Sequence, residues 1–176
     1  MKATNERGIL EPIENCYIKI GEEKIVMNNL PEIGDSKSAS YSDEIVQGRS
    51  TPFKNYSHSD NRSISWTCHF FVQTSNDVHI ILGWIKLLES CVYPLTEITG
   101  GAPYAPPTIC QIKCGRQIAE DEVCVVLKNY NIKFDPNFPW DKESLLPYKT
   151  DVSLEFEVVY NQSRLPGAEK IMDLGA

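Results

Sequence analysis

Carboxylates are the side chains of this sequence that come closest to a catalytic or metal-binding arrangement. Glu155 and Glu157 stand two residues apart, and Glu120, Asp121 and Glu122 are consecutive. Two carboxylates at this spacing on a strand share one face and could act as general acid and base, although an exposed sheet face explains them better. Consecutive carboxylates point to opposite sides of an extended chain, so the triplet is more typical of a solvated turn than of a metal site.

The histidines and thiols complete no recognisable motif for metal binding or nucleophilic catalysis. His69 could be a general base, but it stands on the polar side of an alternating stretch with no nucleophile motif beside it. The 3 histidines and 6 cysteines lack the spacing of zinc ligands. The sequence contains no P-loop, no dinucleotide-binding glycine motif, no GxSxG and no HExxH. We therefore expect no enzymatic activity, no metal and no cofactor.

The cysteines could alternatively be structural. Cys110 and Cys114 are four residues apart, which on a strand is about 13 Å and too far for a disulfide. Synthesis in the cytosol favours reduced, buried thiols, whereas release into an oxidising medium would allow one or two disulfides. The cysteines that could take part are Cys16, Cys68, Cys91, Cys110, Cys114 and Cys124.

The composition indicates a soluble protein of one domain. The chain has 176 residues, of which 41% are hydrophobic, and a formal net charge of −7. The mean hydropathy is −0.30 and the pI is about 5.0. An acidic chain of this kind does not adhere broadly to nucleic acid. No segment has the pattern of a membrane span or a secretory signal, so we expect no membrane binding and synthesis in the cytoplasm.

The first half of the chain predicts a hairpin, loops, a strand and a helix. Residues 16–27 have the pattern of a β-hairpin, and residues 28–42 that of a long loop rich in Ser, Gly and Asn, followed by a short strand at 43–46. The polar stretch QGRSTPFKNYSHSDNRSIS, residues 47–65, predicts a second loop. Apolar residues then alternate over positions 64–70, which indicates a strand with one buried face.

One helix is predicted after this strand. Asp77 is the expected N-cap and Pro94 the expected end. The apolar residues that fall at helical spacing are Ile81, Trp84, Ile85, Leu88 and Val92.

The second half predicts three strands, at residues 108–115, 123–135 and 151–160, with a hairpin-like excursion at 137–147. The expected fold is therefore mainly β, as a β-barrel or two packed antiparallel sheets, with one flanking α-helix. We expect an N-terminal arm at 1–15, the β domain at 16–160 and a C-terminal tail at 161–176.

Three pieces of the sequence occur in a familiar order. They are IVQGRSTPFKNYSHSDNRSISWTCHFF, then WIKLLESCVYP, then APPTICQIKCG with VCVVLKNYNIKFD and PWDKESLLPYKTDVSLEFEVV. Over roughly residues 40–160, this order resembles the tube-initiator and hub proteins of contractile bacteriophage baseplates. Some of those proteins also carry a LysM module, for which this sequence has no counterpart.

The resemblance implies a tail-tube-like fold and a structural role in a virion. Six copies would form a ring in the baseplate hub that joins the hub to the tail tube and templates tube polymerisation. The implied partners are other copies of the chain, the tail tube protein, and other hub and wedge proteins of the baseplate. DNA would only pass transiently through the lumen.

The resemblance also suggests which residues make contacts. A polar loop that carries arginine and aromatic residues suits a subunit interface, so Arg49, Phe53, Tyr56 and Arg62 are the expected subunit-contact residues. Glu155 and Glu157 are lumen candidates, because an acidic channel repels DNA and lets it slide.

Two other functions fit the sequence. The chain could be the major tail tube protein, or a carbohydrate-binding β-sandwich in which exposed aromatic residues such as Tyr104, Trp140 and Tyr148 stack on sugars. A small hydrolase built on Glu155 and Glu157 is the weakest alternative.

Overall fold

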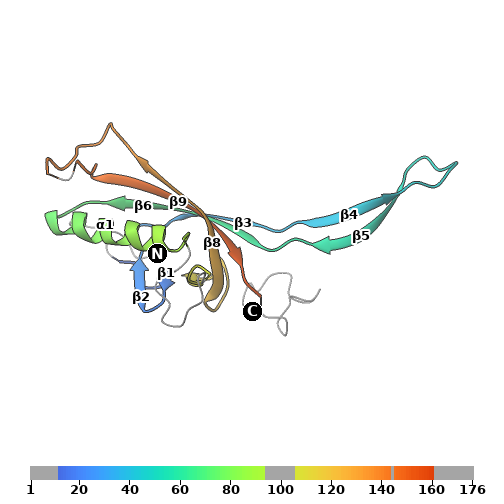
Figure 1. Ribbon diagram of the computed structural model, residues 1–176, viewed down its shortest axis with the longest axis horizontal. Helices are drawn as coiled ribbons and strands as arrows, with labels where there is room; N and C mark the ends of the chain where they lie inside the picture. Colours follow the sequence, from blue (N-terminus) through green and yellow to red (C-terminus); the bar gives the residue numbers. More distant parts are fainter. Residues whose placement is uncertain (1–11, 94–105, 144, 161–176) are drawn as a thin grey trace.

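The protein is mainly β, with a single helix among the residues that the computed structural model describes, which are 12–93, 106–143 and 145–160 (Figure 1). The strands form two antiparallel sheets, which confirms the predicted fold class. In chain order the elements are β1 (Cys16–Ile20), β2 (Glu23–Val26), β3 (Glu32–Ser36), β4 (Ala39–Glu44), β5 (Phe53–Ser59), β6 (Ser63–Phe71), α1 (Ser75–Ser90), β7 (Cys110–Cys114), β8 (Val123–Phe134) and β9 (Lys149–Val158). Within these described ranges, no helix has the length and apolar character needed to cross a membrane.

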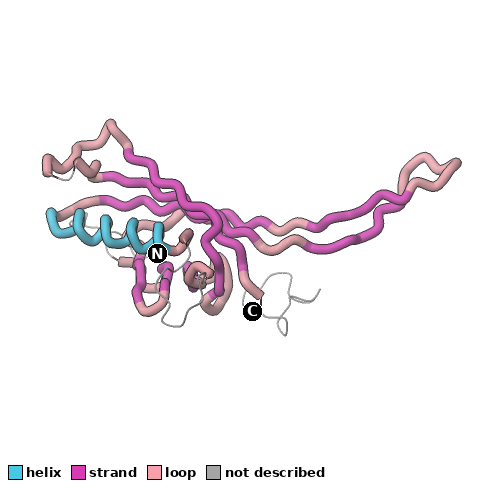
Figure 2. Tube along the Cα trace, in the orientation of Figure 1, coloured by secondary structure: helices cyan, strands magenta, loops and turns pink. Residues whose placement is uncertain are grey.

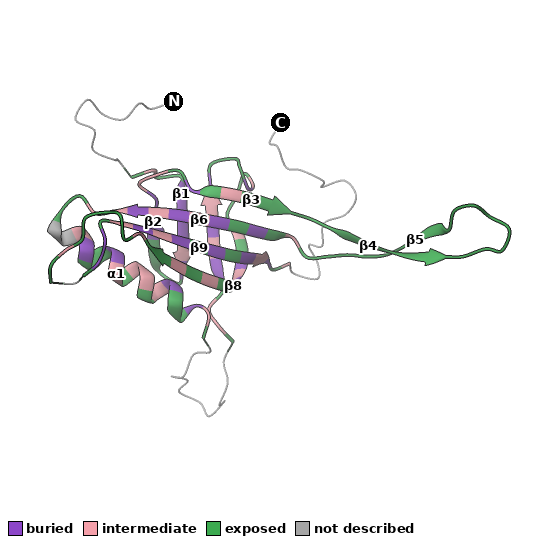
Figure 3. Cartoon of the chain, turned by 90° about the horizontal axis from the view of Figure 1, so that it is seen from above, coloured by how far each residue is buried: buried purple, intermediate pink, exposed green. Residues whose placement is uncertain are grey.

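Seven strands form one sheet in the order β2-β1-β7-β8-β9-β6-β3, in which neighbouring strands are antiparallel. The two halves of this sheet cross: β1 runs across β6 and β9 (Figure 3), and β7 is paired with β1. The long strand β8 joins the halves, because it pairs with both β7 and β9. A bulge lies between Leu127 and Asn129 of β8, and bulges bend a strand and increase its twist. The core therefore lies between two crossing parts of one sheet.

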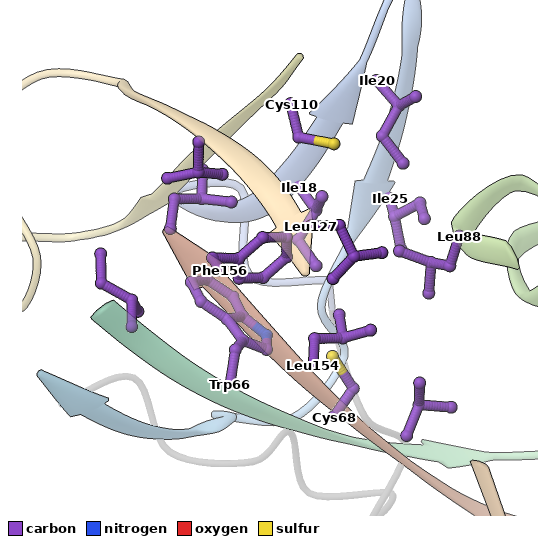
Figure 4. Close-up of a cluster of buried hydrophobic side chains, with 14 of the residues drawn as sticks. Ile18, Ile20, Ile25, Trp66, Cys68, Leu88, Cys110, Leu127, Leu154 and Phe156 are labelled. Carbon is purple, nitrogen blue, oxygen red and sulfur yellow. The ribbon is translucent and has the colours of Figure 1, made fainter. Parts of the chain in front are cut away.

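The paired strands β6 and β9 direct every second side chain into the core, as their alternating patterns predict. Trp66 lies opposite Leu154 and Ile64 opposite Phe156, and these four side chains are at most 1% exposed. Trp66 and Phe156 lie beside each other in the cluster, and Ile18 from the other half of the sheet is close to them (Figure 4). Apolar burial from both halves is the main stabilising contribution to this fold.

The helix α1 covers the same core. It lies on the side of β6 and β9 that also carries β1 and β2 (Figure 1). Ile81 and Leu88 are buried in the core, and the Trp84 ring lies 5.6 Å from that of Phe70 on β6, measured between centroids. The apolar face predicted for this helix is thus the face that packs against the core of the sheet.

The start of α1 differs from the prediction. Thr74 is the N-cap, with extended backbone, and Asp77 stands three residues further on. The Asp77 carboxylate accepts hydrogen bonds from the backbone N–H groups of Thr74, at 2.8 Å, and Gln73, at 3.0 Å. Asp77 is therefore not the N-cap itself; its side chain binds the backbone of the N-cap residue, Thr74, from the first turn of the helix. The helix ends with Cys91 as C-cap, and the expected stop at Pro94 lies outside the described residues.

The loops predicted at residues 28–42 and 47–65 are largely wrong. β4 pairs with β5 from Ala39 opposite Ser59 to Glu44 opposite Phe53, and β3 and β6 continue this pair into the main sheet. Residues 37–62, here called the projecting hairpin, extend far from the body (Figures 1 and 2). The described side chains of β5 are all exposed. A strand pair without a buried face needs no apolar alternation, so its sequence has the composition of a loop.

The crossing of the two sheet halves predicts that the Phe156 ring is essential for stability. Phe156→Ala should lower the free energy of unfolding by about 3–5 kcal/mol, because it leaves a cavity at the centre of the core. Val159→Ala, at a side chain that is 39% exposed, should change it by less than about 0.5 kcal/mol. Urea unfolding followed by tryptophan fluorescence measures both, and equal effects of the two variants would contradict this description of the core.

Candidate subunit-contact surfaces

The projecting hairpin holds its shape through contacts of its own. The Asp60 backbone N–H donates to the Ser38 carbonyl at 2.9 Å, and the Ser38 hydroxyl donates to the Asp60 carboxylate at 2.7 Å. Nearer the tip, the Asn55 side-chain amide donates to the Glu44 carboxylate at 3.0 Å. These bonds pair the two strands along their length, but they bury no core, and a two-stranded ribbon alone is only marginally stable in water.

Aromatic and aliphatic side chains are exposed along this hairpin. The rings of Tyr41 and Tyr56 meet edge to face with 5.8 Å between centroids, and the two residues are 56% and 59% exposed. The Arg49 guanidinium lies over the Phe53 ring, 3.5 Å from its centroid. Ile45, near the tip, is 87% exposed. Three of the four predicted contact residues, namely Arg49, Phe53 and Tyr56, therefore lie on one protruding element.

The fourth predicted contact residue, Arg62, is engaged within the chain at the base of the hairpin. Its guanidinium donates two hydrogen bonds of 2.9 Å to the Asp35 carboxylate and one of 2.8 Å to the Ile118 carbonyl. Its side chain is only 14% exposed. Burial alone would raise the pKa of Asp35, but the hydrogen bonds and charge of Arg62 outweigh it and hold that pKa below its usual value. Arg62 thus fixes β3 to the start of β6 and to the turn after β7.

Glu155 and Glu157 lie on the polar face of the main sheet, opposite the core. Glu155 is exposed, whereas Glu157 accepts hydrogen bonds from Asn61, at 2.6 Å, and from Lys128, at 2.7 Å. These two bonds, led by that of Lys128, lower the pKa of Glu157. The carboxylate is thus held ionised by a neighbouring cation, and a general-acid role has no support in this geometry.

The rest of this face consists mainly of small hydroxyl side chains. Ser63, Ser65 and Thr67 on β6 and Ser153 on β9 point away from the core, in register with the two glutamates or with each other. An antiparallel sheet with one apolar and one hydroxyl-rich face is built to have water on the second face.

His69 lies at one end of the polar face, opposite Asp151, and forms an ionic cluster. Its Nδ1 lies 2.6 Å from the Asp151 carboxylate, and Lys149 lies 3.3 Å from the same carboxylate. Burial raises the pKa of Asp151, but the hydrogen bonds from His69 and Lys149 outweigh it and lower that pKa overall. Among the described residues, neither a serine hydroxyl nor a cysteine thiol is hydrogen-bonded to His69. The cluster joins β6 to β9 instead of forming a catalytic dyad with a nucleophile.

A second exposed apolar surface lies in the connection between β8 and β9. It is called the apolar patch below and consists of Phe134, Phe138, Trp140, Leu145 and Tyr148, which are 37–72% exposed. A bridge between Trp140 and Pro147 and a 2.8 Å hydrogen bond from the Tyr148 N–H to the Pro139 carbonyl hold the connection together, so the predicted excursion is confirmed. Figure 1 shows it at the end of the molecule opposite the projecting hairpin.

The remaining candidates are separate from these surfaces. In the acidic turn, Glu120 and Asp121 are exposed, whereas Glu122 accepts a hydrogen bond from the Tyr17 hydroxyl, which raises the pKa of Tyr17 to about 12. The described part of the chain contains no group of three or more His, Cys, Asp or Glu side chains arranged to hold a metal ion. Tyr104, suggested above for sugar stacking, lies outside the described residues.

No protein-family model matches the chain, and no curated protein shows significant sequence similarity to it. The interpretation of the surfaces therefore depends on their own physical properties.

Sequence reasoning missed most of the apolar patch as a contact surface. The signal was present in and around the excursion between the predicted strands, where six large apolar residues occur within the fifteen positions 134–148 without strand or helix periodicity. Large side chains without a periodic pattern have no fixed core to enter, and they are therefore candidates for an exposed surface.

The bidentate contact of Arg62 should stabilise the fold. Arg62→Ala is expected to lower the free energy of unfolding by about 1–3 kcal/mol, since it leaves the Ile118 carbonyl without this donor and the Asp35 carboxylate with only its longer contact to Lys37, at 3.7 Å. Lys54→Ala is the matched control, because the ion pair of Lys54 with Asp43 is exposed, and it should cost less than about 0.5 kcal/mol. Chemical denaturation gives both values, and an Arg62→Ala loss no larger than that of Lys54→Ala would refute the structural role.

Acid should destabilise the protein through Asp35, Asp151 and Glu157. Their pKa values are lowered in the folded state, so the unfolded chain binds more protons as the pH falls below about 4. The stabilisation is therefore complete above about pH 5 and is lost as the pH falls through the folded-state values. The urea midpoint should drop between pH 5 and pH 3, and by a smaller amount in Arg62→Ala. A midpoint independent of pH over this interval would contradict the expectation.

Proposed function

We propose that this chain is a structural subunit that assembles into a ring and that its projecting hairpin docks on neighbouring subunits. The observation that carries the proposal is the hairpin itself. Residues 37–62 form a long strand pair that buries no core and exposes Tyr41, Phe53 and Tyr56. Exposing such side chains on a marginally stable ribbon is costly unless a partner covers them.

The placement of the two exposed apolar surfaces supports assembly in a repeating order. The hairpin and the apolar patch lie at opposite ends of one molecule. Two different surfaces that meet between copies make a head-to-tail interface, which closes into a ring when the rotation between copies is right. Arginine stacked on an aromatic ring, as in Arg49 and Phe53, is typical of residues that contribute strongly to binding at such interfaces.

The biological setting that fits best is the hub of a contractile phage tail baseplate. The resemblance in motif order suggests it, and a mainly β subunit with one helix and a protruding hairpin suits it. In this proposal six copies form a ring, which receives the tail tube protein and starts tube polymerisation. The ring also contacts other hub and wedge proteins, in a virion assembled in the host cytoplasm.

The polar sheet face is the surface proposed to line the lumen. Glu155 and Glu157 project from it among hydroxyl side chains, and Lys128 offsets part of the charge. A hydrated face without large apolar side chains gives DNA no surface to adhere to as it passes. The net charge of −7 per chain acts in the same direction.

Immunogold electron microscopy on tailed particles from the source lysate tests the setting. The antibody is raised against this chain, and labelling is repeated on particles opened with mild denaturant, since a central ring is covered. Label confined to the baseplate end supports a hub ring, whereas label along the tube identifies the chain as the major tube protein. Absence of label from all particles, with binding on a glycan array, would instead support a sugar-binding module that uses exposed Trp140 and Tyr148.

The hairpin contacts should be required for assembly but not for folding. Arg49→Ala combined with Phe53→Ala should leave the melting temperature within about 2 °C of wild type, because both side chains are exposed. The same variant should lose ring formation in native mass spectrometry. Arg116→Ala with Ile109→Ala, which removes one exposed cation and one exposed apolar side chain away from the hairpin, should assemble normally. Ring formation by the Arg49→Ala/Phe53→Ala variant at the concentrations at which wild type assembles would overturn the assignment of the hairpin as a subunit-contact surface.

A further inference from the structure

Five of the six cysteines are buried in the body of the protein and none lies on the projecting hairpin. All six thiols are unbridged in this structure. Their positions are not scattered, however, because four of them meet in two pairs and both pairs include an end of β7.

The first pair is Cys16 on β1 and Cys114 on β7. The two residues are direct partners in the antiparallel register. The Gly115 N–H donates to the Asn15 carbonyl at 2.8 Å, so position 15 opposite 115 is a hydrogen-bonded site. The next position, Cys16 opposite Cys114, is then the close, non-hydrogen-bonded kind, where Cα atoms are about 4.5 Å apart. That separation falls inside the range of disulfide-bonded cysteines, which is about 4.4–6.8 Å.

The second pair is Cys91 and Cys110. Cys91 is the C-cap of α1, and Cys110 is the first residue of β7. Both side chains are at most 1% exposed. The Cys91 thiol donates to the Leu87 carbonyl at 3.3 Å and the Cys110 thiol to the Thr108 carbonyl at 3.7 Å, and the contact between the two thiols lowers the pKa of Cys91 and raises that of Cys110. The end of α1 and the start of β7 therefore lie close enough for their two thiols to interact.

The other two cysteines have no such partner in the sheet register. Cys68 is buried on β6 opposite Val152, and burial raises its pKa to about 12, which disfavours the reactive thiolate. Cys124 is exposed on β8 opposite Gln111. Cys68 also lies near Cys16, whose pKa it helps to raise, but the register does not place these two residues opposite each other. The pairs given by the structure are therefore Cys16 with Cys114 and Cys91 with Cys110.

We propose that Cys16–Cys114 and Cys91–Cys110 are two disulfide sites that lock both ends of β7, one to β1 and the other to α1. β7, which lies between β1 and β8 in the sheet, is then tied to β1, far from it in sequence, and to the end of α1, the element that precedes it. The projecting hairpin is left free, because neither bridge reaches it. The bridges would lock the body of a released particle and place no covalent constraint on the projecting hairpin, and the sites themselves do not depend on the proposed function.

The chemistry is thiol–disulfide exchange with a low-molecular-weight disulfide such as oxidised glutathione. A cysteine thiolate attacks one glutathione sulfur, and the second glutathione leaves as a thiolate that takes up a proton. The paired cysteine then displaces the first glutathione. For each protein disulfide formed, two cysteine thiols lose two protons and two electrons, and the glutathione disulfide gains them to become two glutathione thiols.

The contact within each pair prepares one cysteine for this attack. The hydrogen bond from Cys16 lowers the pKa of Cys114, while the same contact raises that of Cys16. In the other pair, the hydrogen bond with Cys110 lowers the pKa of Cys91. Deep burial excludes glutathione, so oxidation should be slow in the folded chain and faster where the body opens briefly.

Peptide mapping of the oxidised full-length chain tests the proposal. The purified protein is incubated with oxidised glutathione in dilute urea and trapped with iodoacetamide, and disulfide-linked peptides are identified under non-reducing conditions. The expected links are Cys16–Cys114 and Cys91–Cys110, with Cys68 and Cys124 recovered as alkylated thiols. The melting temperature should rise by roughly 5–15 °C and return on reduction. Six alkylated thiols after this treatment, or links that involve Cys68 or Cys124 instead, would overturn the proposal.

Variants separate the two bridges from general effects of oxidation. Cys124→Ser should give the same links and the same melting shift as wild type. Cys16→Ala with Cys114→Ala should keep the Cys91–Cys110 link and lose part of the shift. If that variant fails to fold, Cys114→Ala alone should leave Cys16 alkylated and unlinked. A disulfide between Cys16 and Cys68 in the oxidised wild-type protein would refute the proposed pairing.

Discussion

The structure depends on the pairing of β9 along its whole length with β6 on one side and β8 on the other. Nine successive register pairs join β9 to β6, from Lys149 opposite Phe71 to Glu157 opposite Ser63. Since side chains alternate along a strand, this one register decides which residues enter the core and which face water. It buries Trp66 and Phe156 on one face and leaves the hydroxyl groups and glutamates on the other. A slip of one residue would exchange the two faces.

The same pairing explains how the projecting hairpin can exist. β6 is anchored by β9 over its full length, and β3 pairs along its outer edge, so both strands leave the body already aligned. The contact of Arg62 with Asp35 and Ile118 fixes the point of departure. Beyond it the ribbon is held by its own hydrogen bonds, and the exposed rings of Tyr41, Phe53 and Tyr56 are available for contact with another molecule. Stability is thus concentrated in the body, and the proposed function places recognition in the hairpin.

The sequence predicted the parts of the fold that bury a periodic apolar face. β6, β9 and α1 were predicted from period-2 and period-3.6 patterns, and their inward residues are those expected. The hairpin was missed because a solvent-exposed strand pair has no such pattern, and its Ser, Asn and charged residues resemble those of a loop. Arg62 and Arg49 were both predicted to be subunit-contact residues because they lie in the same polar stretch of the sequence. Its partners Asp35 and Ile118 come from other elements, and only the folded topology brings them near it. The cysteine pairs were likewise hidden, since spacing within β7 excludes Cys110–Cys114 but says nothing of partners on β1 and α1.

Cross-linking between isotopically distinct copies would test the central claim, that the projecting hairpin docks on another subunit. Unlabelled and ¹⁵N-labelled chains are mixed, allowed to assemble and treated with a lysine-reactive cross-linker. The account predicts mixed-isotope links that join Lys54, on β5, to a lysine in the body of another copy, such as Lys133 or Lys149 near the apolar patch. Links from Lys54 only to lysines of its own chain, in a sample that stays monomeric, would contradict it.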